Sequence, residues 1–451
     1  MQVFMRTAFS AAAIAALSIS FAQAQQTLAP VVVSANPLGA DINDLITPVS
    51  VLRGDQLTQN QSSTLGQTLN QLPGVSSSDF GPNSSRPVIR GLDGDRIRIM
   101  NNGGASMDVS GLSYDHAVAI EPLLVEQIEV VRGPAALQYG GSAIGGAVNV
   151  IDNRIPKAPV KGVNGRGELR AGGAESERAA AGVVTVGDGR FALHVDGADR
   201  KTDDLKVPKQ AGRGAAINQG RLLNSNADQQ SGAIGASLTG DHGYVGLSID
   251  SYKNDYGTGL FESPTDLDEP KRIKLKQDRL TLAGEQRNLA GKMGPLESIR
   301  GSFSSTDYKH EELAAGVVES TFKNKGWDSR IEGTHVPIQT SLGALKGAWG
   351  VQGSESKFSA TSFGAHGAFV PNAKTDSKAL FVFEELSFAP DKAVNAGFRY
   401  EDVKVQSLGN GVDNHFPVDS KNFKPFSLAL GYRQDMGSGW TATSGLSYTE
   451  R

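Results

Sequence analysis

Asp115 and His116 stand side by side in the stretch SGLSYDHAVAI, a loop of mostly small residues. A carboxylate beside an imidazole can move protons or bind a metal ion, or it can be ordinary loop polarity. In a loop both side chains can reach one ion, whereas neighbours on a strand point to opposite faces. The chain has no cysteine, which excludes thiolate metal sites and cysteine nucleophiles. No Ser/His/Asp grouping at a recognisable spacing accompanies the pair, so we do not expect an enzyme.

The composition limits the class of partner. The chain has 451 residues, 54 of them glycine, so it is long enough for more than one domain. Charged residues make up 20%, with a formal net charge of -4. Phosphate recognition needs a strongly basic face, so we expect no nucleic-acid partner.

The N-terminus has the pattern of a secretory signal peptide over residues 1–24. Arg6 precedes an apolar run from about Ala8 to Phe21, and the small-x-small triplet Ala22 to Ala24 follows. The run is too short for a membrane anchor, and no later stretch reaches the roughly 18 unbroken apolar residues of a spanning helix. An exported chain of this kind is periplasmic, secreted, or membrane-spanning as a β-barrel.

From about Gly165 onward the pattern has a period of two, which is typical of strands. In RFALHVDG, the apolar residues Phe191, Leu193 and Val195 share one face. Tight turns are predicted near residues 188–189, 241–242, 291–294, 339–343, 390–391 and 436–439. They alternate with longer polar segments, predicted as loops, at residues 201–231, 254–276, 307–325, 359–377 and 406–424. Outer-membrane barrels show this asymmetry, whereas a soluble β-sandwich has no reason to keep its long loops at one end.

These segments predict a mainly β fold with two parts. Residues 40–160 read as a compact α+β domain that fills the barrel as a plug. Residues 161–451 read as an antiparallel transmembrane β-barrel of roughly thirteen strands, each near the 9–11 residues that cross a bilayer. Plugged lumens belong to barrels of about 22 strands, so we expect an incomplete barrel and a chain that continues in a longer protein.

Three stretches of the plug carry a family resemblance: LGQTLNQLPGV, RPVIRGLDGDRIRIMNNG and VEQIEVVRGPAALQYGGSAIGGAVNVI. In this order they resemble TonB-dependent outer-membrane receptors. The resemblance implies location in the outer membrane of a Gram-negative bacterium, contact with its lipid, and no required cofactor. It also implies that the segment 25–39 contains a TonB box, which pairs by β-augmentation with the TonB energy-coupling protein. That box corresponds to Leu28, Ala29, Pro30, Val31, Val32, Val33, Ser34 and Ala35.

Within that family, SYDHAV, DNRIP, DYKHEE and LKGAWGVQ are most similar to the zinc-uptake receptors. The resemblance implies zinc as the transported ion, with Asp115 and His116 on the plug and Glu312 from a barrel loop as ligands. The family's remaining histidine ligand lies beyond the segment that matches SYTER, so we expect an incomplete site. His310, two residues before Glu312, is a further candidate: such a pair can chelate on a strand face, or it can be local loop polarity.

Two other functions remain open. A receptor for a ferric siderophore or another metal chelate would have the same architecture, with aromatic and Arg side chains at the plug apex. The stretch NNGGASMDVSGLSYDHA offers only Tyr114 and no Arg, which favours a bare ion. A passive porin or a surface-binding protein would need neither plug nor TonB box.

Overall fold

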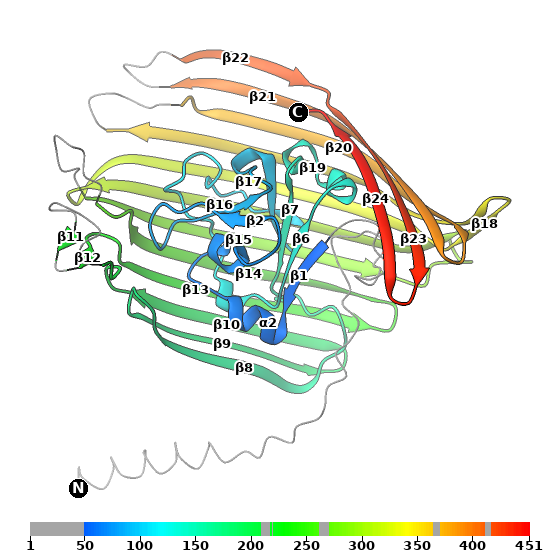
Figure 1. Ribbon diagram of the computed structural model, residues 1–451, viewed down its shortest axis with the longest axis horizontal. Helices are drawn as coiled ribbons and strands as arrows, with labels where there is room; N and C mark the ends of the chain where they lie inside the picture. The colour runs from blue at the N-terminus through cyan, green and yellow to red at the C-terminus, as the bar shows by residue number, and fades with distance from the viewer. Residues whose placement is uncertain (1–48, 209–216, 219, 261–269, 364–369, 411–415) are drawn as a thin grey trace, which may run out of the picture. The chain divides into compact units, whose positions relative to one another are not determined.

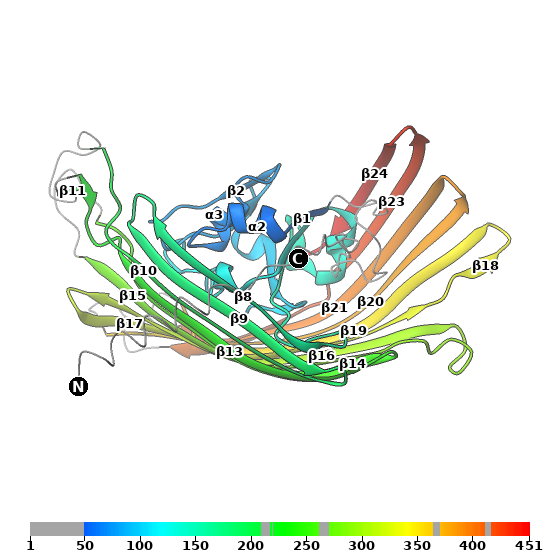
Figure 2. The same cartoon turned by 90° about the horizontal axis from the view of Figure 1, so that it is seen from below.

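The computed structural model describes residues 49–208, 217–218, 220–260, 270–363, 370–410 and 416–451. They form a small mixed domain, the plug, and a large antiparallel sheet (Figure 1). The sheet is curved like a trough, and the plug elements lie on its concave side (Figure 2). This confirms the predicted fold class, mainly β with an α+β plug before an antiparallel sheet.

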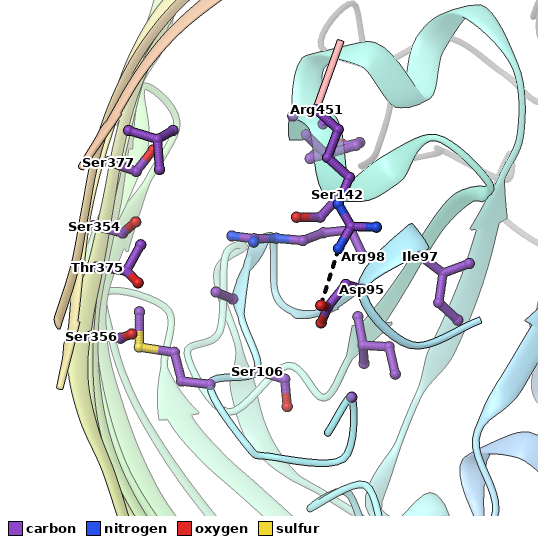
Figure 3. A pocket seen from close by; sticks show the side chains of 18 of the residues that line it. Asp95, Ile97, Arg98, Ser106, Ser142, Ser354, Ser356, Thr375, Ser377 and Arg451 are labelled. Atoms are coloured by element: carbon purple, nitrogen blue, oxygen red, sulfur yellow. Dashed lines mark hydrogen bonds and ion pairs between the residues drawn. The ribbon is translucent and has the colours of Figure 1, made fainter. Parts of the chain in front are cut away.

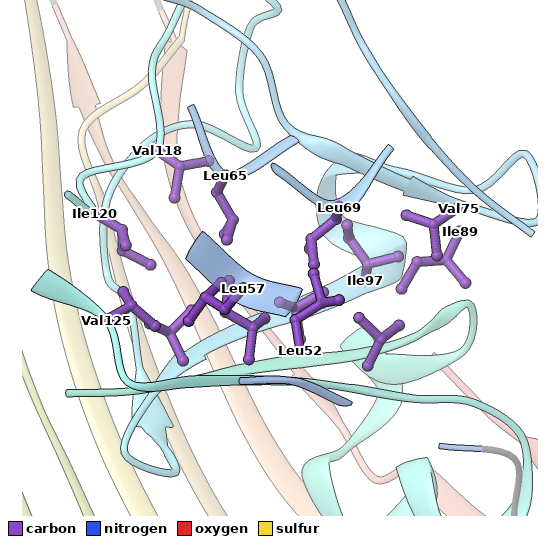
Figure 4. Close-up of a cluster of buried hydrophobic side chains, with 14 residues drawn as sticks. Leu52, Leu57, Leu65, Leu69, Val75, Ile89, Ile97, Val118, Ile120 and Val125 are labelled. Carbon is purple, nitrogen blue, oxygen red and sulfur yellow. The ribbon is translucent and has the colours of Figure 1, made fainter. Parts of the chain in front are cut away.

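The plug is built on a five-stranded sheet in the order β1-β6-β7-β4-β5, in which β4 and β7 run parallel. Its core joins short apolar strands to two short helices, as Figure 4 shows. Among the described residues, no helix is long and apolar enough to cross a membrane. The plug elements are β1 (Val49–Arg53), α2 (Gly54–Asn60), α3 (Leu65–Leu69), β2 (Val75–Ser77), β3 (Pro87–Ile89), η2 (Gly94–Arg96), β4 (Ile97–Asn101), β5 (Gly104–Ala105), η3 (Pro122–Leu124), β6 (Gln127–Val131), η4 (Pro134–Tyr139), η5 (Gly141–Ala143) and β7 (Gly146–Ile151).

The large sheet has 15 strands, of which thirteen follow one another and two, β18 and β22, are short additions. Each strand of the main path pairs with its neighbours in sequence, and β8 and β24 form the two edges. The thirteen strands are β8 (Lys161–Gly172), β9 (Glu177–Asp188), β10 (Phe191–Thr202), β13 (Ala227–Gly240), β14 (Gly243–Gly257), β15 (Lys271–Gln286), β16 (Leu296–Ala314), β17 (Val317–His335), β19 (Gly343–Ser362), β20 (Ala373–Ala389), β21 (Lys392–Asn410), β23 (Phe426–Gly437) and β24 (Trp440–Thr449). The short strands are β18 (Ile338–Thr340) and β22 (Phe416–Phe423), and β11 (Ile217–Asn218) pairs with β12 (Arg221–Leu222) in a separate hairpin.

The strands are longer than the sequence predicted. They range from 10 to 20 residues because the polar segments beside the long connections continue the strands. The predicted loop 307–325 is wrong in this respect, since β16 and β17 meet at a turn of only Ala315 and Gly316. Asp307 and Lys325 are cross-strand partners on the outer face and form an exposed ion pair at 2.6 Å. Because this end of the hairpin has polar residues on both faces, its composition is the same as that of a loop.

The two faces of the sheet have opposite polarity. On β14, Val245, Leu247 and Ile249 are 60%, 46% and 59% exposed on the convex face. Ser248 and Asp250 point to the concave side and are 3% and 8% exposed. A monomeric soluble protein rarely exposes such a continuous apolar band, whereas a membrane barrel has lipid on its outer face. The alternation predicted from the sequence is confirmed here.

Candidate metal centre

The plug loop that carries the predicted ligands lies between β5 and η3. Asp115 is in a turn and His116 in a bend, so the predicted loop is present. The carboxylate of Asp108 holds the loop together, since it accepts hydrogen bonds from the backbone N–H of Ser110 at 3.0 Å and of Ala119 at 3.3 Å. One side chain therefore ties the two ends of the ligand-bearing loop to each other.

Arg86 fixes the same loop from a second side. Its guanidinium donates to the carbonyl of Ser113 at 3.2 Å, pairs with Asp93 at 3.0 Å, and lies 4.3 Å from the ring centre of Tyr114. The stretch NNGGASMDVSGLSYDHA itself has no arginine, but Arg86 reaches the loop from another segment. Arg86 is 6% exposed and holds the loop from a buried position beside the cavity described below.

Strand β16 brings two further donors to this loop. His310 and Glu312 are two residues apart, so both side chains point to the concave side. Glu312 lies on a strand and not at the start of a loop as the sequence analysis expected, and the bulge between Glu312 and Leu313 comes directly after it. Both side chains point to the concave side because they lie on the same face of β16.

The structure brings His116, His310 and Glu312 into one compact group. One ligand atom from each of the three lies within 4.8 Å of the others. Glu312 Oε1 is 3.0 Å from His116 Nε2 and 3.7 Å from His310 Nε2. Donors bound to one tetrahedral zinc ion are about 3.3 Å apart, so this spacing fits a single ion. Asp115 lies beside the group, with Oδ1 3.9 Å from His116 Nε2 and a hydrogen bond from Ser113.

The hydrogen bonds of His116 leave one ring nitrogen for a ligand. Nδ1 lies 3.1 Å from the carbonyl of Val109, which can only accept, so Nδ1 carries the proton and Nε2 faces Glu312. Burial disfavours a charge on His116, but the hydrogen bond to Glu312 and the charge of Asp115 outweigh it and raise the pKa of His116. A metal ion at this position would replace the proton between Nε2 and the carboxylate.

His310 is also held through its Nδ1 atom. Its Nδ1 lies 2.9 Å from the hydroxyl of Tyr308, and its Nε2 has no hydrogen-bond partner among the described residues. The side chain is fully buried, which makes an unpaired nitrogen costly. Metal-binding histidines use one ring nitrogen for a supporting hydrogen bond and the other for the ion.

An aromatic side chain packs against the two histidines. The ring of Phe322 on β17 stacks on His310 at 4.6 Å and contacts the edge of His116 at 5.3 Å. Glu312 accepts a hydrogen bond from the hydroxyl of Ser320, its cross-strand partner on β17. This apolar shell lowers the local dielectric and strengthens any interaction between an ion and its ligands.

Two tyrosines of the site, Tyr308 and Tyr256, were not predicted from the sequence. Tyr308 shares the inner face of β16 with His310 and Glu312, and a period of two carried through DYKHEE would have found it. Tyr256 on β14 contacts the ligand loop across the lumen, and no sequence signal indicates that contact.

A cavity of about 890 Å³ lies next to the loop, between the plug and strands β19 to β21. Its barrel wall carries four hydroxyls in two cross-strand pairs, Ser354 with Ser377 and Ser356 with Thr375. Figure 3 shows these four side chains on the wall, with Arg98 on the facing plug. The cavity therefore has hydroxyl groups on its barrel wall and is large enough for an organic ligand.

The predicted signal peptide, residues 1–24, and the predicted TonB box, residues 28–35, lie outside the described residues.

Comparisons with known proteins agree with this architecture. Residues 41–147 match the family model of the TonB-dependent Receptor Plug Domain. The chain is 28% identical over 250 residues to the Vitamin B12 transporter BtuB of Photobacterium profundum, covering 52% of this chain and 38% of the relative. It is 30% identical over 138 residues to BtuB of Vibrio vulnificus, covering 30% of this chain and 22% of the relative. The chain thus spans less than half the length of these curated relatives.

Among solved structures, the Copper transporter OprC has a TM-score of 0.70 against this fold, at 16% identity. The match covers 88% of this chain and 63% of that chain. At this identity the likeness shows a common fold and no more.

Proposed function

We propose that this chain, which has the plug domain of TonB-dependent receptors and their barrel fold, is an energy-coupled outer-membrane receptor that imports zinc. The ion is held between the plug loop and β16 by His116, His310 and Glu312, with Asp115 beside them. The apolar convex face of the sheet supports contact with outer-membrane lipid.

The observation that carries the proposal is the buried Nε2 of His310, which has no hydrogen-bond partner in the described part of the chain and belongs to a group with His116 and Glu312. Two imidazole nitrogens and one carboxylate oxygen are donors that zinc prefers when thiolates are absent. Both histidines use Nδ1 for a supporting hydrogen bond, so both present Nε2 to the same place. A side-chain rotation of Asp115 away from Ser113 would add a fourth donor.

The division of the site between two parts of the chain suggests how the ion is released. His116 belongs to the plug, whereas His310 and Glu312 belong to the sheet. We propose that the TonB energy-coupling protein pulls on residues 28–35 and displaces the plug loop. This motion separates the donors, and a site that loses one of its histidines holds the ion less tightly.

The variant Glu312→Gln tests the ion site with little change in side-chain shape. The amide keeps the shape of the side chain but has no charge, so zinc affinity is expected to fall about tenfold, or roughly 1.4 kcal/mol. Calorimetry on the purified protein in detergent measures the dissociation constant.

Glu311→Gln is the matched control. Glu311 is the neighbouring acid on β16, points away from the group, and pairs with Lys309 at 2.6 Å. It is expected to leave zinc affinity unchanged. Equal affinities of the two variants would contradict the assignment of Glu312.

A second candidate function is import of a metal chelate, and the cavity beside the loop favours it. Hydroxyls on β19 and β20 face Arg98, whose guanidinium lies 3.8 Å from Asp328, so this wall offers hydrogen bonds to an oxygen-rich ligand. The two relatives described above are vitamin B12 transporters. Calorimetry with free zinc distinguishes the two functions, because a receptor for chelates alone would not bind the bare ion.

A further inference from the structure

The hydroxyl of Tyr256 hydrogen-bonds to the backbone of the plug loop on both sides of His116. It donates a hydrogen bond to the carbonyl of Asp115 at 2.7 Å and accepts one from the backbone N–H of Ala117 at 2.8 Å. The side chain comes from β14 and is fully buried. One atom of the barrel wall therefore holds the residues before and after the proposed ligand.

Next to His116 the loop uses this support in addition to the hydrogen bonds of Asp108 and Arg86. The backbone N–H of His116 reaches the carbonyl of Ser113 only at 3.4 Å. The carbonyl of Asp115 and the N–H of Ala117 are thus satisfied by a side chain from another part of the fold. Buried backbone groups without a partner are costly, so the loop conformation depends on the hydroxyl.

The register of the sheet links Tyr256 to the other half of the site. Tyr256 pairs with Ile273 on β15, and Ile273 pairs with Glu312 on β16. The residue that holds the loop and the residue that supplies the carboxylate thus lie in one row across three strands. Ala117, Tyr256 and Ile273 also pack in one buried cluster, so the row contacts the loop through its side chains as well.

We infer that Tyr256 is a positioning residue for the metal site, an inference that rests on the proposed function. Its hydroxyl sets the backbone at His116, while Val109 sets the rotation of the imidazole ring. Together they direct Nε2 toward Glu312 and His310. Displacement of the plug breaks both hydrogen bonds of Tyr256 in the same step that separates the donors.

The variant Tyr256→Phe tests this role. Phenylalanine keeps the ring and its packing on Ala117 and Ile273 but removes both hydrogen bonds. Loss of a group that orients a metal ligand costs 10- to 100-fold in affinity, so the dissociation constant for zinc is expected to rise about tenfold. Calorimetry with zinc on the full chain in detergent gives the constant, and the absorption spectrum of the Co²⁺-loaded protein reports a changed ligand geometry.

Tyr252→Phe is the matched control. Tyr252 lies four residues earlier on the same face of β14, is 4% exposed, and accepts a hydrogen bond from Asn254 at 3.4 Å. Its hydroxyl has no hydrogen bond to the ligand loop among the described residues. The control is expected to change zinc affinity less than twofold.

A double-variant cycle separates positioning from a general loss of order. In the His116→Ala background, Tyr256→Phe is expected to cause no further loss, because its effect passes through His116. An equal loss in both backgrounds would overturn the inference, and so would equal effects of Tyr256→Phe and Tyr252→Phe. If His116→Ala itself leaves zinc affinity unchanged, the proposed function fails and the inference fails with it.

Discussion

Replacing both His116 and His310 by alanine raises the dissociation constant for zinc by a factor of at least about 100, or roughly 2.8 kcal/mol. This is the expected result because the double variant removes both nitrogen donors and leaves one carboxylate of the compact group. Lone carboxylates prefer hard ions such as Mg²⁺ and Ca²⁺, so the selectivity for zinc is lost together with the affinity. Calorimetry with Zn²⁺ and with Mg²⁺ measures both effects.

The matched control removes two histidines elsewhere. His242 lies in the turn between β13 and β14, and His335 ends β17, where it lies 3.2 Å from Glu384. The double variant His242→Ala/His335→Ala is expected to bind zinc like the parent chain. If it weakens binding as much as the site variant, zinc binds to scattered histidines and the proposed site is wrong.

Deleting residues 28–35 abolishes zinc uptake by cells and leaves zinc binding to the purified protein unchanged. The reason is that this segment is proposed to pair with the energy-coupling protein, and none of the proposed ligands lies in it. Accumulation of radioactive zinc in cells that carry the variant measures uptake, and calorimetry measures binding. Uptake that continues after the deletion would remove the energy-coupled model.

A single substitution sharpens this prediction. β-Augmentation uses backbone N–H groups, and proline has none, so Val32→Pro is expected to reduce uptake nearly as much as the deletion. Val32→Ala keeps the N–H group and is expected to retain uptake. If both variants reduce uptake equally, the Val32 side chain rather than strand pairing is required.

The sheet could be predicted from the sequence because strand periodicity is local. Alternation in RFALHVDG and YVGLSID follows from lipid on one side and a polar lumen on the other. The tight turns at Asp241 and Pro390 could also be predicted, because the signal for a turn lies in a few adjacent residues such as Asp, Gly and Pro. The loop at Asp115 and His116 was predicted for the same reason.

The rest of the site depends on contacts between distant segments. His310 and Glu312 fell within the predicted loop 307–325 because exposed charges alternate with inward side chains on β16. Arg86 and Tyr256 reach the ligand loop only through the tertiary fold, and neither has a sequence pattern that indicates it. Asp115 was expected as a primary ligand, but its carboxylate accepts a hydrogen bond from Ser113 and lies at the side of the group.

The pairing of each strand with its neighbours in sequence has a consequence for assembly. A sheet of this kind can grow one hairpin at a time, since every new strand pairs with the one before it and closes only a short stretch of chain. The plug comes first in the chain, and the three proposed donors, with Ser320 and Phe322 around them, are all present once the chain reaches β17. The residues proposed to hold the ion therefore all lie in the plug and the first part of the sheet, and none of them depends on β19 to β24 for its place in the chain.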